Sequence, residues 1–197
     1  MSDLGTSYPK PFERVMGFID GGYLRELCKK HGKTANVHFG LLYATLIVRF
    51  NSMPLNPFQA NLIRIYYYDA IVDETHADYN AQRKYFEAIP TKLPYTVRLG
   101  KLVESANKGF KQKGVDILMS VDAITKAYTN QYDVGIFLIG DRDFMPMVEA
   151  VKDAGKKTMC MYYPANSSRD LIRTFDFKCV LDEKSIRTLV KTKQSNS

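Results

Sequence analysis

The stretch Ile136-Phe137-Leu138-Ile139-Gly140-Asp141-Arg142-Asp143-Phe144 changes character halfway along its length. The apolar, partly β-branched run over 134–139 predicts a strand buried on both faces, as in a parallel sheet. After it, apolar residues recur at helical spacing as far as Val151, and Asp143 suits the N-cap of that helix. Asp141 and Asp143 are therefore expected at the carboxyl end of a strand, where open α/β sheets bind their ligands.

Strand and helix patterns alternate along the rest of the chain. The predicted strands cover residues 15–19, 62–68, 95–99, 134–139, 157–163 and 177–181. The connections are long enough for right-handed crossovers. We therefore expect an α/β fold, a three-layer α/β/α sandwich with a mainly parallel central sheet of five to six strands. The sequence predicts one domain over residues 14–182, with flexible terminal segments at 1–13 and 183–197.

The composition is that of an ordinary globular protein, with 45% hydrophobic and 25% charged residues among 197. No apolar stretch approaches the roughly 20 residues of a membrane span, and the first residues do not resemble a secretory signal. The cysteines Cys28, Cys160 and Cys179 are scattered, which predicts unpaired thiols in a reducing cytoplasm. A net charge of +7 favours a polyanionic partner, nucleic acid first.

Four aspartates stand out by their position in this pattern. Asp20 ends the first strand, and Asp116 opens the helix that leads into the strand at 134–139. If the first strand and that strand are neighbours, Asp20, Asp141 and Asp143 share one crevice. Clustered carboxylates raise the cost of ionising one another, and a bound Mg²⁺ relieves that repulsion. An acidic crevice in a basic protein therefore predicts metal-dependent phosphodiester chemistry.

Simpler roles remain open for several of these residues. Asp143 alone could be only a helix cap, and Asp116 only a first-turn carboxylate favoured by the helix dipole. Arg142, between the two aspartates, could contact a phosphate or pair with an acid. Asp122 is interpreted as a structural or outer group, and Asp69 as a turn residue after its strand.

The segment 98–113 contains five basic residues and one acidic residue, and it is predicted to be a loop. Its Lys108, Lys111 and Lys113 could contact a nucleic-acid backbone, and Phe110 could stack on a base. The alternative is a loop whose charges only keep the protein in solution. The segment is the strongest candidate for an RNA-binding surface outside the acidic residues.

A second predicted helix, from Asn36 to Phe50, is apolar nearly all round. Such a helix is either deeply buried or partly a partner surface. This helix therefore leads us to expect a homodimer or another protein partner.

Several other chemistries do not fit the sequence. It contains no glycine-rich phosphate loop of P-loop or dinucleotide type and no G-x-S-x-G motif. The first strand lacks the Asp-x-Asp pair of phosphoaspartyl phosphatases, and His31, His38 and His76 lie at no zinc-binding spacing. Metal-held carboxylates therefore remain the best-supported chemistry.

Four motifs together carry a family resemblance. They are Phe18-Ile19-Asp20-Gly21, Lys113-Gly114-Val115-Asp116 with Asp122-Ala123, Leu138-Ile139-Gly140-Asp141-Arg142-Asp143-Phe144-Met145-Pro146, and Ser167 or Ser168 before Leu171. In order and spacing they resemble the NYN domain, and within it the LabA-like branch of the PIN-like nucleases, over about residues 14 to 182.

The resemblance implies a parallel α/β/α sandwich and an acidic centre that binds Mg²⁺ or Mn²⁺. It gives the acidic positions to Asp20, Asp116, Asp141 and Asp143, and it implies a ribonuclease, most simply an endoribonuclease. One position departs from the pattern, because Tyr23 stands where the family commonly has Asn. A non-catalytic RNA-binding adaptor on the same fold is therefore the alternative, and a metal-dependent phosphatase or nucleotidase is the third.

Overall fold

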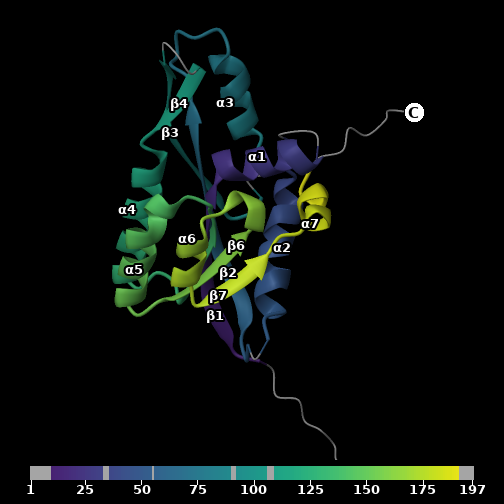
Figure 1. Ribbon diagram of the computed structural model, residues 1–197, viewed down its shortest axis with the longest axis vertical. Coiled ribbons are helices and arrows are strands. Elements are labelled where there is room, and N and C mark those ends of the chain that lie inside the picture. The colour runs from purple at the N-terminus through teal and green to yellow at the C-terminus, as the bar shows by residue number, and fades with distance from the viewer. Residues whose placement is uncertain (1–9, 33–35, 55, 90–91, 106–108, 191–197) are drawn as a thin grey trace, which may run out of the picture.

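The computed structural model describes residues 10–32, 36–54, 56–89, 92–105 and 109–190. Its strands are β1 (Phe12–Asp20), β2 (Gln59–Ile71), β3 (Tyr95–Ser105), β4 (Gly109–Lys113), β5 (Val134–Leu138), β6 (Lys157–Tyr162) and β7 (Phe177–Val180). They form one sheet in the order β4-β3-β2-β1-β5-β6-β7 (Figure 1). The predicted edge strand at 177–181 is confirmed as β7.

Helices cover both faces of this sheet. They are α1 (Gly21–Gly32), α2 (Phe39–Asn51), α3 (Tyr79–Glu87), α4 (Val115–Tyr128), α5 (Met145–Asp153), α6 (Arg169–Thr174) and α7 (Glu183–Thr188). Two apolar cores result. One lies between the sheet and α1, α2, α3 and α7, and the other between the sheet and α4, α5 and α6 (Figure 1). The predicted α/β fold with helices on both faces is confirmed.

The sheet itself is larger than predicted, and it is mixed. The expectation of a mainly parallel sheet of five to six strands is wrong, because the described residues form seven strands and β3 pairs with β4 antiparallel. The segment 98–113, predicted as a loop, instead extends β3 and returns as β4. Gly100 permits this close return, since a Cβ at that position would lie 2.5 Å from the Lys113 carbonyl oxygen. The predicted strand ended at residue 99, whereas β3 continues through Gly100, and this glycine makes room for the neighbouring strand.

The ordered fold also extends beyond the predicted domain boundaries. β1 begins at Phe12, and part of the C-terminal segment predicted to be flexible forms α7. The Asp182 carboxylate caps this helix by accepting the Ser185 backbone N–H at 2.7 Å, and Ile186 is buried beneath it. A short helix with a cap and one apolar anchor carries too little hydrophobic periodicity to be predicted from the sequence.

The apolar second helix is partly buried and partly exposed. α2 buries one stripe, including Leu42 and Leu46, against the sheet. It leaves Leu41 43% exposed and Val48 58% exposed, beside α7. The helix begins after His38, whose Nδ1 accepts the Leu41 backbone N–H, and not after Asn36 as predicted.

The topology brings two strand ends together. β1 lies between β2 and β5 and is parallel to both, with Ile19 opposite Leu138. The chain leaves β1 toward β2, β3 and β4 and then returns to β5 on the other side. This is a topological switch point, where a crevice forms outside the carboxyl ends of the strands. Within the described residues, no helix is both long and apolar enough to cross a membrane.

Candidate functional site

Asp20 is the last residue of β1 and lies at this switch point. Its Oδ1 accepts the backbone N–H of Tyr23 at 3.0 Å, in the first turn of α1. The carboxyl group is largely enclosed, and this burial raises its pKa to about 6, with further contributions from the negative charges of Asp116 and Asp69. Burial and neighbouring negative charge therefore destabilise the ionised form of Asp20, and a bound cation would stabilise it.

Asp141 follows β5 across the same crevice. Its backbone is extended, with φ −84° and ψ 135°, and its Oδ1 accepts the Asp143 backbone N–H at 3.0 Å. This bond caps a short 3-10 turn, Arg142–Phe144, that leads directly into α5. The prediction of Asp143 as the N-cap is therefore wrong, because Asp141 fills that role and Asp143 lies exposed within the turn. The capping bond fixes one oxygen of Asp141.

Asp116 lies in the first turn of α4, behind Gly114, which takes a left-handed conformation with φ 82°. Burial raises the pKa of Asp116, and the charges of Asp141 and Asp143 raise it further. Asp116 in turn raises the pKa of Asp20. Asp116 therefore lies within electrostatic reach of Asp20 on one side and of Asp141 and Asp143 on the other.

The arrangement limits the kind of metal site that these aspartates can form. Among the described residues, no group of three or more His, Cys, Asp or Glu side chains is arranged to hold a metal ion. Asp20, Asp141 and Asp143 are therefore not brought together as one three-ligand group. Mg²⁺ commonly retains several waters and binds one or two carboxylates together with substrate phosphates. Carboxylate oxygens suit such a cation, and binding of Mg²⁺ or Mn²⁺ by these aspartates stays a prediction.

A buried polar network beside Asp20 was missed by sequence reasoning. Asp69, at the end of β2, is fully buried, and burial raises its pKa while the Arg25 charge opposes that shift. Arg25 Nη2 donates to Asp69 Oδ1 at 2.6 Å, and Gln112 Nε2 donates to the same oxygen at 3.3 Å. The Tyr67 hydroxyl donates to Oδ2 at 3.3 Å. Asp69 is therefore not the turn residue that was predicted.

The signal that could have revealed Asp69 is its place after an apolar strand, which is the same as that of Asp20. Gln112 gave no such signal, because its position depends on the unpredicted strand β4. A Cβ at Gly22 would lie 2.9 Å from Gln112 Nε2 and 3.2 Å from Asp20 Oδ1. The β3–β4 hairpin therefore directly borders the acidic site.

Tyr23, which stands where the family commonly has Asn, packs between α1 and the segments that follow β5 and β6. Its hydroxyl lies 2.7 Å from Ser167 Oγ and accepts the Tyr163 backbone N–H at 3.0 Å. Its ring covers Gly140, where an added Cβ would lie 2.5 Å from Tyr23 Cε2. The Tyr23 hydroxyl is thus hydrogen-bonded to the segment that follows β6, and Tyr23 connects α1 to that segment.

The predicted RNA-contacting residues do not form one surface. Lys111 and Lys113 alternate with Phe110 along β4, so the two lysines face one side of the hairpin and Phe110 faces the other. Phe110 is 45% exposed and meets the His76 ring edge-on at a centroid distance of 5.4 Å. Lys108 lies outside the described residues. The lysine face of the hairpin is the part that remains a candidate for phosphate contacts.

Two other charged residues near the site have identifiable partners. Arg142 Nη1 lies 3.6 Å from Asp170 Oδ2, and both side chains are exposed, so the alternative of pairing with an acid is the one observed. Asp122 accepts bonds from Lys126 at 2.9 Å and from the Tyr68 hydroxyl at 3.1 Å. Opposite charge and hydrogen bonds lower its pKa against the effect of burial. Asp122 therefore stabilises α4 on the sheet, as its structural interpretation predicted.

Comparisons with known proteins agree with this architecture. A protein of unknown function from Vibrio parahaemolyticus has a solved structure with a TM-score of 0.61 and 16% sequence identity. The match covers 89% of this chain and 96% of that one, which shows a shared fold. No curated protein matches the sequence significantly. The family model of the NYN domain, which has a PIN-like nuclease fold, matches residues 14–182, and the chain therefore belongs to the NYN domain family.

Proposed function

We propose that this protein is a Mg²⁺- or Mn²⁺-dependent ribonuclease that hydrolyses RNA phosphodiester bonds. The observation that carries the proposal is the electrostatic coupling of Asp116 to Asp20 and to the pair Asp141 and Asp143, at a switch point of the sheet. The uncompensated negative charge of this edge favours a divalent cation, and its neighbouring lysines favour a phosphate backbone. We assign the chain to the LabA-like branch as part of this proposal.

In this proposal the chain's residues divide the work. One or two of the carboxylates of Asp20, Asp141 and Asp143 would hold the metal together with water, and the metal when bound would supply Lewis acidity and an activated water. Asp116 lies beside them and orients the attacking water or holds a second ion. Lys111 and Lys113 contact the RNA backbone from the hairpin. Gln112 and the Arg25–Asp69 pair hold the Asp20 side of the site in place.

The proposal extends to setting and partners. Cys28 and Cys160 are buried free thiols and Cys179 is a partly buried one, which suits a reducing cytoplasm. The exposed part of α2 around Leu41 and Val48 is the surface that we propose for a homodimer or another protein partner.

The test is cleavage of a single-stranded RNA in Mg²⁺, in Mn²⁺ and in EDTA. We expect metal-dependent endonucleolytic cleavage that Asp20→Asn and Asp141→Asn each reduce by roughly 1000-fold, because several kcal/mol of charge stabilisation are lost. Asp153→Asn is the matched control, an exposed aspartate at the far end of α5. Metal-dependent cleavage that survives both site substitutions would contradict this site assignment.

A second candidate is an RNA-binding adaptor without catalysis. Its support is the engagement of the Tyr23 hydroxyl by Ser167, at the position where the family commonly has Asn. The same titration separates the two functions, because an adaptor binds RNA without cutting it at any metal concentration. Turnover of mononucleotides without RNA cleavage would instead indicate a phosphatase or nucleotidase.

A further inference from the structure

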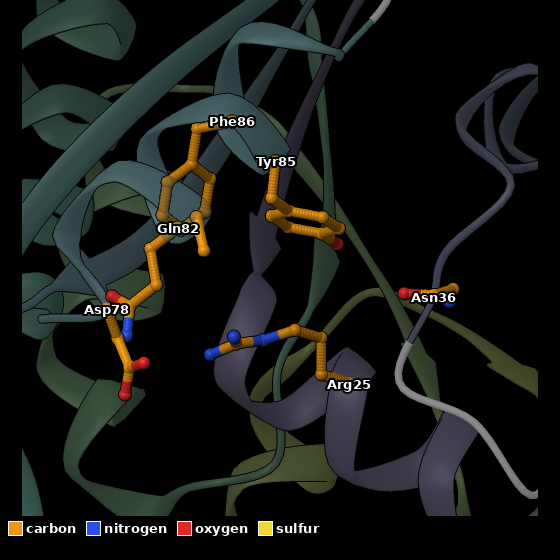
Figure 2. A pocket seen from close by; sticks show the side chains of 7 residues that line it. Arg25, Asn36, Asp78, Gln82, Tyr85 and Phe86 are labelled. Carbon is orange, nitrogen blue, oxygen red and sulfur yellow. The ribbon is translucent and has the colours of Figure 1, made fainter.

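A cavity of about 320 Å³ lies between α1, α3 and the segment before α2. Figure 2 shows the Tyr85 ring above the Arg25 side chain, with Asp78 and Gln82 to one side and Asn36 to the other. None of these residues is one of the four aspartates of the acidic site. The volume is in the range of small-molecule sites, and the lining mixes a flat ring, a guanidinium group and amide and carboxylate groups.

The guanidinium plane of Arg25 is fixed before any ligand arrives. Its Nη2 donates to the buried Asp69 carboxylate at 2.6 Å, and its Nε donates to the Gly21 carbonyl at 3.3 Å. Two anchors on different nitrogens restrict rotation of the plane. An arginine fixed in this way stacks on flat π-systems at a low cost in conformational entropy. Tyr85, on the other side of the hollow, offers a second stacking surface.

The side of the cavity at Asp78 and Gln82 has a defined pattern of donors and acceptors. Gln82 Oε1 already accepts the Val72 backbone N–H at 3.1 Å, so the Gln82 amide has its N–H donors to offer a ligand. The His76 Nδ1 accepts the Asp78 backbone N–H at 3.1 Å and therefore is not a donor to the Asp78 carboxylate. Asp78 consequently presents two acceptor oxygens beside one amide donor.

We propose that this cavity binds a guanine base of the RNA, stacked between Tyr85 and Arg25. Guanine is the standard base that offers two adjacent N–H donors, N1–H and N2–H, next to an acceptor, O6. Those donors match the Asp78 carboxylate, and O6 matches the Gln82 amide. Unpaired bases are recognised in this way, by stacking and by hydrogen bonds to their Watson–Crick edge. The inference rests on the proposed function, because it names the substrate specificity of the same nuclease.

The cavity is physically connected to the acidic site through Arg25. The guanidinium that stacks on the base also binds Asp69, whose charge acts on Asp20, and it contacts Gly21, the residue after Asp20. A base held on Arg25 would thus contact a side chain that is hydrogen-bonded both to Asp69 and to the residue after Asp20, and the proposal directs its sugar-phosphate toward Asp20. The expected consequence is cleavage beside guanosine.

The first test is nucleotide binding by calorimetry in EDTA, with GMP, AMP, CMP and UMP as probes. We expect GMP to bind at least about tenfold more tightly than the other three. Tyr85→Leu should weaken GMP binding about tenfold through lost stacking, and Tyr85→Phe should retain it. Asp78 is exposed and makes no capping hydrogen bond, so Asp78→Asn should leave the fold intact while it removes the preference for guanine. Glu87→Gln, an exposed change on α3, is the control. Equal binding of all four nucleotides, or none, would overturn the proposal.

The second test separates this inference from the proposed function. GMP binding should persist in Asp20→Asn, which removes cleavage but leaves the cavity. An oligouridine with one internal guanosine should be cut beside that residue by the wild-type protein. RNA cleavage without GMP binding and without a preference for positions beside guanosine would contradict guanine binding by the cavity and would still support the ribonuclease. GMP binding without any RNA cleavage would support the cavity and contradict the ribonuclease.

Discussion

The two sides of the acidic crevice present the same residue type in opposite surroundings. On the β1 side, Asp20 is enclosed, and it adjoins the buried network of Asp69, Arg25 and Gln112. On the β5 side, Asp141 and Asp143 are exposed, and the internal bond of Asp141 reaches only the Asp143 backbone N–H. One side is therefore built into the core, and the other is a solvated turn.

In the proposed metal site, this difference would combine an enclosed carboxylate with solvent-exposed ones. Burial raises the pKa of Asp20 and makes its charge costly until a cation arrives. Asp141 and Asp143 are exposed to solvent, so water reaches their carboxylates before any ligand binds. The comparison can be tested by changing one side at a time.

The largest expected effect on stability comes from the buried network. Asp69→Asn leaves Arg25 without its carboxylate partner and should lower the free energy of unfolding by about 3 kcal/mol, since one member of a buried ion pair is lost. Asp143→Asn on the exposed side should change it by less than about 0.5 kcal/mol. Urea unfolding of both variants measures the difference. Equal effects would mean that the two sides do not differ in the way described.

The second effect concerns pH. Asp20 has a pKa of about 6 in the folded protein, against 3.8 for an ordinary aspartate. Between these values the folded chain binds more protons than the unfolded chain, so stability falls as pH rises from about 4 to about 6. The loss is on the order of 2 kcal/mol. Asp20→Asn should remove this loss in metal-free buffer, as measured by thermal unfolding across that range, and a variant that keeps the wild-type pH profile would refute the shifted pKa.

A third, smaller effect separates the two exposed aspartates. Asp141→Ala removes the cap of the turn that leads into α5 and should cost about 1 kcal/mol, whereas Asp143→Ala should cost almost nothing. Chemical denaturation of the pair provides the measurement. The reverse order would restore Asp143 as the cap.

The smallest effect is expected at the hairpin. Lys111→Ala should weaken RNA binding by only a few-fold and reduce the slope of log affinity against log salt by about 0.7, the value for one contact to a single-stranded phosphate. Phe110→Ala, on the opposite face of β4, should leave that slope unchanged. Binding isotherms at several salt concentrations give both values. A slope unaffected by Lys111→Ala would exclude the lysine face from RNA binding.

Much of the fold was predictable because buried parallel strands have a strong local signal. The runs that became β1 and β5 are apolar and are followed by aspartate or glycine, and those features placed Asp20 and Asp141 at strand ends. β4 was not predictable, because an edge strand of Gly, Lys and Gln carries neither alternation of apolar residues nor β-branched side chains. Once β4 was missed, the contact of Gln112 with the site could not be foreseen.

The candidate site was predicted in part for the same reason. The ends of the predicted strands located Asp20, Asp141 and Asp143. The N-cap was assigned to Asp143 instead of Asp141, because aspartate is a good cap at either position and only the backbone angles distinguish the two. Asp69 and Arg25 were missed because they are 44 residues apart and are joined only by tertiary packing. Long-range polar pairs leave no periodic trace in a sequence.

The contact between Tyr23 and Gly140 has a consequence for the shape of the crevice. An added Cβ at Gly140 would also lie 2.6 Å from the Asn166 carbonyl oxygen, so this glycine is enclosed from two sides. The aromatic ring therefore acts as a spacer of fixed thickness between the first turn of α1 and the end of β5. Asparagine has no ring and could not fill the same space beside Gly140. The packing of α1 against the residue before Asp141 thus depends on an uncharged ring.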